Sequence, residues 1–138
     1  MISRKERTSR EVSDWLEKEG AGASQVEGII VRLENLDLLD DERFAMLFAE
    51  GKRDHAGWGA ERIEKALIGR GIEPGLARAA AASGEQDELE RAVELLWERD
   101  HDLEDPLARQ RALGLLARRG FSADDAYEAI RLARRRAA

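Results

Sequence analysis

A short sequence pattern occurs three times in this chain and restricts the folds that it can adopt. Each copy holds an apolar pair and, four residues after the second member of the pair, a glycine. The copies span residues 15–20, 66–71 and 115–120, and their glycines lie 51 and 49 residues apart. Self-similarity at a period of about 50 residues is typical of arrays of small helical units. Such arrays present a long curved surface to a large partner, whereas enzymes usually need a closed pocket, so the repeat favours binding over catalysis.

The composition predicts an all-α protein. Aromatic residues make up only 5% of the 138 residues, there are 2 prolines, and the residues between the glycines are mostly the helix formers Ala, Leu, Glu and Arg. No cysteine is present, which excludes disulfides and cysteine-bound metals. No run approaches the roughly 20 apolar residues that cross a bilayer, and the first residues are polar, so we expect a cytoplasmic protein without membrane contact.

Charge is distributed unevenly along the chain. Residues 109–138 carry a net charge of +5 and residues 1–108 carry −11, for a total of −6. Proteins whose main task is to bind naked nucleic acid are usually basic overall, because neutralisation of phosphates supplies most non-specific affinity. The sequence therefore favours a protein partner, with the basic end left to meet phosphates or an acidic protein surface, and the acidic remainder facing a basic partner or solvent.

Capping signals divide the chain into about eight helices. A capping box at Thr8 and Glu11 predicts the start of the first helix, which should end at Gly20, and Ser24 with Glu27 predicts the next start. Later starts are predicted at Asp40, Glu73-Pro74, Asp105-Pro106 and Ser122, and a further helix should end at Gly120. Residues 82–87 lack large apolar residues and predict a joint between units.

Residues that could carry catalysis or bind metal show no suitable pattern. His55 and His101 stand apart, without a nearby nucleophile or the paired spacing of a zinc site. The acids of residues 40–42 are best explained by helix capping. We therefore expect no enzyme activity, no catalytic residue, no metal and no cofactor. Trp15 and Trp97 fall on apolar helix faces and are predicted to be buried, whereas Trp58, between two glycines, is open to either interpretation.

Several segments resemble the RecX family of regulatory proteins. The central signature is carried by residues 39–45, 57–63 and 70–72, and residues 118–122 resemble the third unit of the same family. The resemblance covers nearly the whole chain. It implies a curved, elongated array of three-helix units, here with a first unit that lacks its first helix, so that eight helices replace nine. The expected units are residues 1–38, 39–84 and 85–138.

The resemblance also implies a function. RecX proteins modulate the RecA recombinase, mostly by binding its filament on single-stranded DNA and suppressing ATP hydrolysis, strand exchange and SOS co-protease activity. We therefore expect a regulatory monomer whose partner is the RecA filament, with at most weak direct contact to DNA.

The expected partner-binding residues are basic and follow the family's joint positions on the second helices of the second and third units, with two more at the C-terminal end. They are Arg62, Lys65, Arg70, Arg109, Arg111, Arg118, Arg119, Arg134 and Arg135. For each of them the simpler explanation is that the side chain lies on a solvated helix face and binds no partner.

Two other functions remain open at this stage. The Gly57-Trp58-Gly59 segment before a helix resembles the glycine hairpin with which helix-hairpin-helix proteins place backbone N–H groups on phosphate. This suggests a direct DNA-binding module. A general scaffold for some other protein is the third possibility.

Overall fold

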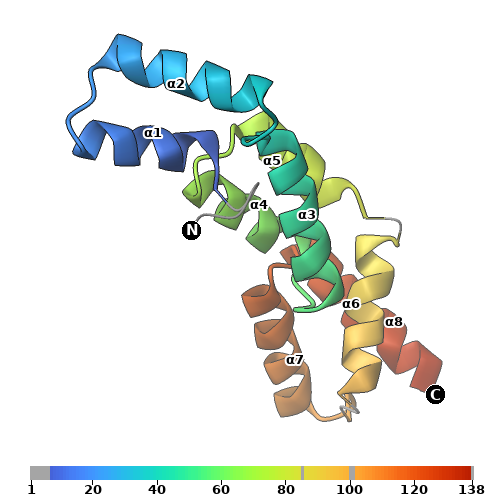
Figure 1. Cartoon of the computed structure of the whole chain (residues 1–138). Coiled ribbons are helices and arrows are strands. Elements are labelled where there is room, and N and C mark those ends of the chain that lie inside the picture. The colour runs from blue at the N-terminus through green and yellow to red at the C-terminus, as the bar shows by residue number, and fades with distance from the viewer. Residues whose placement is uncertain (1–6, 85, 100–101, 138) are drawn as a thin grey trace.

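The computed structural model describes residues 7–84, 86–99 and 102–137, which form eight α-helices and no strand (Figure 1). The helices are α1 (Ser9–Lys18), α2 (Ala23–Asn35), α3 (Asp41–Asp54), α4 (Ala60–Gly69), α5 (Pro74–Ala82), α6 (Glu88–Glu98), α7 (Pro106–Arg119) and α8 (Ala123–Ala137). They follow one another as an elongated, curved array, so the all-α repeat class predicted from the sequence is confirmed.

Most of the predicted helix starts are confirmed by hydrogen bonds of the capping side chains. The Thr8 hydroxyl accepts from the N–H of Glu11 and the Glu11 carboxylate accepts from the N–H of Thr8, which completes the capping box of α1. The side chains that cap α3, α5, α7 and α8 each accept from a backbone N–H of the first turn; they are Asp40, Glu73, Asp105 and Ser122.

The predicted start of the second helix is wrong. Helix α2 begins at Ala23, and its N-cap is Gly22, which offers no side-chain hydrogen bond. Ser24 and Glu27 therefore lie inside the helix. Glycine is a tolerated N-cap residue, so the true start left no side-chain signal in the sequence.

Two apolar cores hold the array together. One is built by α3, α4 and α5 around residues such as Ile63 and Leu67, and the other by α6, α7 and α8 around residues such as Leu96 and Leu116. Helices α1 and α2 pack on each other, but no residue of α1 is buried and Val26 is the only buried residue of α2. The two-helix end of the array therefore has far less apolar burial than the two three-helix units.

The prediction that Trp15 and Trp97 are buried is wrong. Trp15 is 58% exposed on α1 and Trp97 is 40% exposed on α6, where the guanidinium of Arg136 lies 5.2 Å from its ring centre. Both residues fit an apolar helical stripe, but neither has enough neighbouring helix surface to cover an indole.

Helices α7, α4 and α1 are arranged end to end along one side of the array (Figure 1). The carbonyls of Arg119 and Gly120, at the end of α7, accept from the N–H groups of Gly59 and Glu61 at the start of α4, at 2.6 and 3.1 Å. The end of α4 meets the start of α1 in a related way, because the hydroxyl of Thr8 donates to the carbonyl of Arg70 at 2.6 Å. Each pair of helix ends thus satisfies backbone groups that a helix end otherwise leaves without a partner.

The repeated glycines serve these junctions. Gly71 and Gly120 follow α4 and α7 with φ of +90° and +96°, and a Cβ on Gly120 would lie 2.2 Å from the Cβ of Arg62. Gly20 follows α1 with φ of +99° but meets nothing within 4 Å. The three glycines share one backbone conformation. Gly71 and Gly120 add a close approach between helices, because a Cβ on Gly71 would also lie only 2.5 Å from the Cβ of Arg10.

This difference predicts unequal effects of two substitutions. Gly20→Ala should cost about 1 kcal/mol, the cost of the left-handed conformation alone. Gly120→Ala should cost about 1–3 kcal/mol more, because the new methyl group overlaps Arg62. Urea unfolding monitored by circular dichroism measures both values, and equal losses would contradict the close packing at Gly120.

Candidate partner-binding surface

The joint between the second and third units is built largely by arginines. The guanidinium of Arg62 donates to the carbonyl of Arg118 at 3.0 Å, and that of Arg119 donates to the carbonyl of Ala56 at 2.8 Å. The first bond joins α4 to the end of α7, and the second joins the end of α7 to the loop before α4. Two of the predicted partner-binding arginines therefore hold the chain's own joint together.

Arg91 of α6 is a largely buried cation of this joint, with 10% of its side chain exposed. Its guanidinium donates to the carbonyl of Trp58 at 2.6 Å and to the carboxylate of Glu88 at 2.6 Å. Burial lowers the pKa of Arg91, although the neighbouring Glu88 carboxylate opposes that effect. Glu88 also accepts from the N–H of Ala60, so α6 caps the start of α4.

The joint between the first two units is also polar. Arg70 makes a two-pronged ion pair with Glu11, with N···O distances of 2.7 and 2.9 Å, and its guanidinium lies 4.7 Å from the ring centre of Phe44. The N–H and hydroxyl of Ser9 both donate to the carboxylate of Asp41, at 2.8 and 2.6 Å. Arg70, a third predicted partner-binding residue, is thus also part of a joint.

A cluster of aromatic and basic side chains covers the outside of the joint between the second and third units. The ring of Trp58 lies 3.9 Å from the guanidinium of Arg62 and 4.7 Å from the ammonium of Lys52, and its edge meets Phe48. These distances fit cation–π contacts. Trp58 is half-buried against the core of the second unit, so it serves packing and holds two cations beside it.

Four of the nine predicted residues are exposed and make no side-chain hydrogen bond or ion pair with any other described residue. They are Arg135 near the C-terminal end and, at the joint between the second and third units, Lys65, Arg111 and Arg118. Lys65 shares its helix face with Arg62, three residues earlier on α4, and Arg111 shares a face with Arg118, seven residues later on α7. Since the end of α7 is hydrogen-bonded to the start of α4, these two helix faces meet at the joint. We call Arg62, Lys65, Arg111 and Arg118, with Lys52, the basic face.

The last three predicted residues lie near the C-terminal end of the third unit. Arg109 donates to the carbonyls of Leu103 and Glu104, at 2.8 and 3.0 Å, and so stabilises the loop before α7. Arg134 pairs with the Glu104 carboxylate at 3.3 Å and lowers its pKa. Arg135 is exposed and helps Arg131 to lower the pKa of Glu128.

The glycine-hairpin interpretation of residues 57–59 is wrong. The N–H groups of Gly59, Ala60 and Glu61 all donate within the protein, to Arg119, Glu88 and Gly120 respectively. The N–H of Trp58 donates to the carbonyl of Lys52. Only the N–H of Gly57 makes no hydrogen bond with another described residue, so the segment does not present the several N–H groups that would hold a phosphate.

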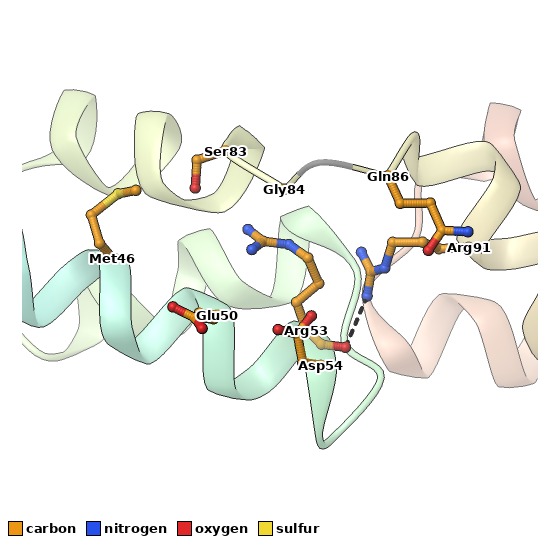
Figure 2. Close-up of a pocket in the computed structure, with 8 residues that line it drawn as sticks. All are labelled: Met46, Glu50, Arg53, Asp54, Ser83, Gly84, Gln86 and Arg91. Atoms are coloured by element: carbon orange, nitrogen blue, oxygen red, sulfur yellow. Dashed lines mark hydrogen bonds between the residues drawn. The ribbon is translucent and has the colours of Figure 1, made fainter.

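A cavity of about 530 Å³ lies between the second and third units (Figure 2). Two arginines line it, but Arg53 donates to the carbonyls of Ala80 and Ala81, and Arg91 reaches the carbonyl of Arg53 at 3.4 Å. Glu50 and Asp54 stand beside them. Because both cations are occupied and two carboxylates are near, the cavity does not suit an anion.

Within residues 7–84, 86–99 and 102–137, no three His, Cys, Asp or Glu side chains come together in a group that could hold a metal ion. His55 is exposed at the end of α3, and His101 lies outside the described residues. No helix in the described part of the chain is long and apolar enough to cross a membrane.

Comparison with known proteins identifies the family. A family model for the second three-helix domain of RecX matches residues 40–80. The chain is 32% identical over 127 residues to the regulatory protein RecX of Halorhodospira halophila, with 90% of this chain and 78% of that protein aligned. The chain belongs to the RecX family of regulatory proteins.

Other RecX proteins give the same result. The chain is 30% identical over 127 residues to RecX of Bacillus licheniformis, where it spans 48% of the relative's length, and 27% identical over 138 residues to RecX of a Mycobacterium species, where it spans 75%. The crystal structure of RecX from Lactobacillus salivarius has the same fold, with a TM-score of 0.75, 23% identity and 92% of this chain covered.

Sequence reasoning missed several residues of the RecX joints, above all Lys52, Arg53 and Arg91. The first two lie in the last turn of α3, where cations are expected to complement the helix dipole. Arg91 directly precedes the buried Ala92 and Val93 of α6, and this position was the available signal that its side chain is shielded from solvent.

The Glu11–Arg70 pair predicts a pH-dependent stability. Its hydrogen bonds lower the pKa of Glu11 below its ordinary value of 4.5 in the folded chain. The stabilisation is therefore complete above the pKa of the unfolded state and is lost as the pH falls through the lower folded-state pKa. Glu11→Gln should reduce the free energy of unfolding by about 1 kcal/mol at pH 7 and by much less at pH 3. Urea unfolding at both pH values tests this, and a pH-independent loss would contradict the role of the ion pair.

Proposed function

We propose that this RecX family chain binds the RecA recombinase filament on single-stranded DNA and lowers its ATPase, recombinase and SOS co-protease activities. The proposal places the protein in the cytoplasm, where such filaments form, as a regulatory protein with no catalytic residue of its own. Membership of the RecX family supports the partner, and the surface of the array supports the mode of binding.

The observation that carries the mode of binding is the basic face. Lys65, Arg111 and Arg118 are exposed on two helices that adjoin end to end, and none of them has an ion-pair partner among the described residues. The chain carries a net charge of −6, whereas the basic face gathers five cations. Cations without internal partners are suited to carboxylates on a protein surface or to phosphates. We place the filament contact there.

The joints support a mechanism for inhibition. In this proposal the units 39–84 and 85–138 contact neighbouring recombinase subunits, and the unit 1–38 extends the contact. Because the joints are hydrogen-bonded at several points, bending the array would break these bonds. A stiff array bound to two subunits resists changes in their spacing, and it thereby restrains the motions that accompany ATP turnover.

The ends of the array support binding as a monomer. At the two internal joints an arginine precedes the glycine, Arg70 before Gly71 and Arg119 before Gly120. At the end of α1, which is the outer end of the row of helices, Glu19 and not an arginine precedes Gly20. In a head-to-tail stack of copies this end would face the start of α7 in the next copy, and that start is capped by Asp105. Two carboxylates would then face each other, which opposes head-to-tail stacking of copies.

The basic face predicts the effect of charge reversal. The double variant Lys65→Glu/Arg118→Glu should require about tenfold more protein than the wild type to suppress ATP hydrolysis by the cognate recombinase on single-stranded DNA. The matched control, Arg32→Glu/Arg43→Glu, has the same charge change at exposed positions of α2 and α3 and should inhibit like the wild type. Arg119 is left intact because it holds the joint.

Three outcomes would contradict this proposal in different ways. Full inhibition by the basic-face variant would reject the site, and no suppression by the wild type would reject the partner. The wild type could also bind single-stranded DNA in the absence of recombinase. A slope of roughly −3.5 for the logarithm of the binding constant against the logarithm of the salt concentration would then favour direct DNA binding through about five arginine–phosphate contacts.

A further inference from the structure

The second and third units meet without a shared apolar core. One core is confined to α3, α4 and α5, and the other is confined to α6, α7 and α8. In the described part of the chain no helix of one unit packs along a helix of the other. Two bodies joined without a large apolar interface are free to move relative to each other unless other contacts prevent it. The angle between these units therefore depends on polar contacts.

The first set of polar contacts lies where two helix ends meet. The carbonyls of Arg119 and Gly120 at the end of α7 accept from the N–H groups of Gly59 and Glu61 at the start of α4 (Figure 1). These bonds hold the two helix ends together. Because they are gathered at one place, they act as a pivot and leave rotation of one unit about the other weakly opposed.

The second set of polar contacts comes from another helix, α6, and reaches the end of α3 and the loop after it. The guanidinium of Arg91 donates to the carbonyl of Trp58 at 2.6 Å and to that of Arg53 at 3.4 Å (Figure 2). It also pairs with Glu88 of its own helix at 2.6 Å, and Glu88 accepts from the N–H of Ala60. A second attachment, on a different helix, fixes an angle that the pivot alone leaves free.

The surroundings of Arg91 make this attachment hard to replace. Only 10% of its side chain is exposed, so its bonds are shielded from water and its loss leaves buried carbonyls without a donor. The cavity of about 530 Å³ lies beside it, between the two units (Figure 2). No apolar packing at this place would take over if the guanidinium were removed.

The basic face is divided between the two units. Lys52, Arg62 and Lys65 belong to the second unit, whereas Arg111 and Arg118 belong to the third. The angle between the units therefore decides whether both halves of the basic face can contact one partner at the same time.

Arg91 also anchors the residue beside which two of these cations lie. It bonds to the carbonyl of Trp58, and the ring of Trp58 lies 3.9 Å from the guanidinium of Arg62 and 4.7 Å from the ammonium of Lys52. The side chain of Arg91 is thus connected to the basic face without being part of it.

We propose that Arg91 is a positioning residue, which fixes the angle between the units 39–84 and 85–138 and thereby holds the two halves of the basic face in one geometry. The first part of this inference concerns the chain alone, and the second part rests on the proposed function. Two binding surfaces on one chain reinforce each other only when their geometry allows both to bind at once.

The angle can be measured by pulsed electron paramagnetic resonance, because the chain has no cysteine and engineered cysteines can be spin-labelled one pair at a time. Labels at the exposed positions Ala79 and Gln110 report the distance between the units, and labels at Gln110 and Ala123 report a distance within the third unit. Arg91→Met should widen the first distance distribution at least about twofold and leave the second unchanged. The matched control, Arg99→Met, removes the same charge at an exposed position and should change neither.

A double variant separates the lost attachment from a charge left alone. Arg91→Met leaves the Glu88 carboxylate without its cation, whereas Arg91→Met/Glu88→Gln leaves no such carboxylate and should give the same wide distribution between the units. An unchanged distribution between the units, equal widening within the third unit, equal widening by Arg99→Met, or a narrow distribution in the double variant would overturn the proposal.

The connection to the basic face is tested by ATP hydrolysis of the cognate recombinase on single-stranded DNA. Arg91→Met should require about tenfold more protein than the wild type for suppression, although it retains every cation of the basic face, and Arg99→Met should act like the wild type. Suppression by Arg91→Met at the wild-type level, together with a widened distance distribution, would overturn this connection. If the wild type itself gives no suppression, the proposed function and this connection fail together, whereas the distance measurements still decide whether Arg91 fixes the angle.

Discussion

The junction between successive helix ends is the interaction on which this structure depends. A helix leaves its last carbonyls and its first N–H groups without partners inside the helix. Here the last carbonyls of α7 accept hydrogen bonds from the first N–H groups of α4. The helix dipoles are also aligned, since the negative end of one helix meets the positive end of the next. The junction needs backbones in direct contact, which explains why Gly59 and Gly120 face each other without side chains.

The junctions also determine the use of the arginines. Arg62, Arg70, Arg91 and Arg119 bond to carbonyls or carboxylates across a joint, so their charge serves the shape of the array. A guanidinium can do this because its five donors form a rigid planar fork, whereas a lysine offers a single flexible ammonium. Lys65, Arg111 and Arg118 face outward without such partners on the two helices that meet at this junction.

The array is not uniform along its length. The two three-helix units have their own apolar cores, while α1 and α2 are attached to the second unit by Thr8, Ser9 and Glu11, all through polar contacts. Polar attachment fixes the position of the helix pair without using its apolar face. That end of the array therefore has little apolar burial, and the arginine-rich residues 109–138 lie in the unit at the other end.

The sequence by itself determined the number of helices, most of their starts, the repeated left-handed glycines and the family. The helix starts depend on capping hydrogen bonds between residues two or three positions apart, as in the capping of α3 by Asp40. The tertiary structure decided which arginines point to solvent, where the N–H groups of residues 59–61 find partners, and that Trp15 is exposed. Those outcomes depend on contacts such as Glu11 with Arg70, 59 positions apart, and Arg119 with Ala56, 63 positions apart. Local spacing predicts that a helix has a basic face, but only the packing of distant segments determines whether a partner inside the chain already occupies it.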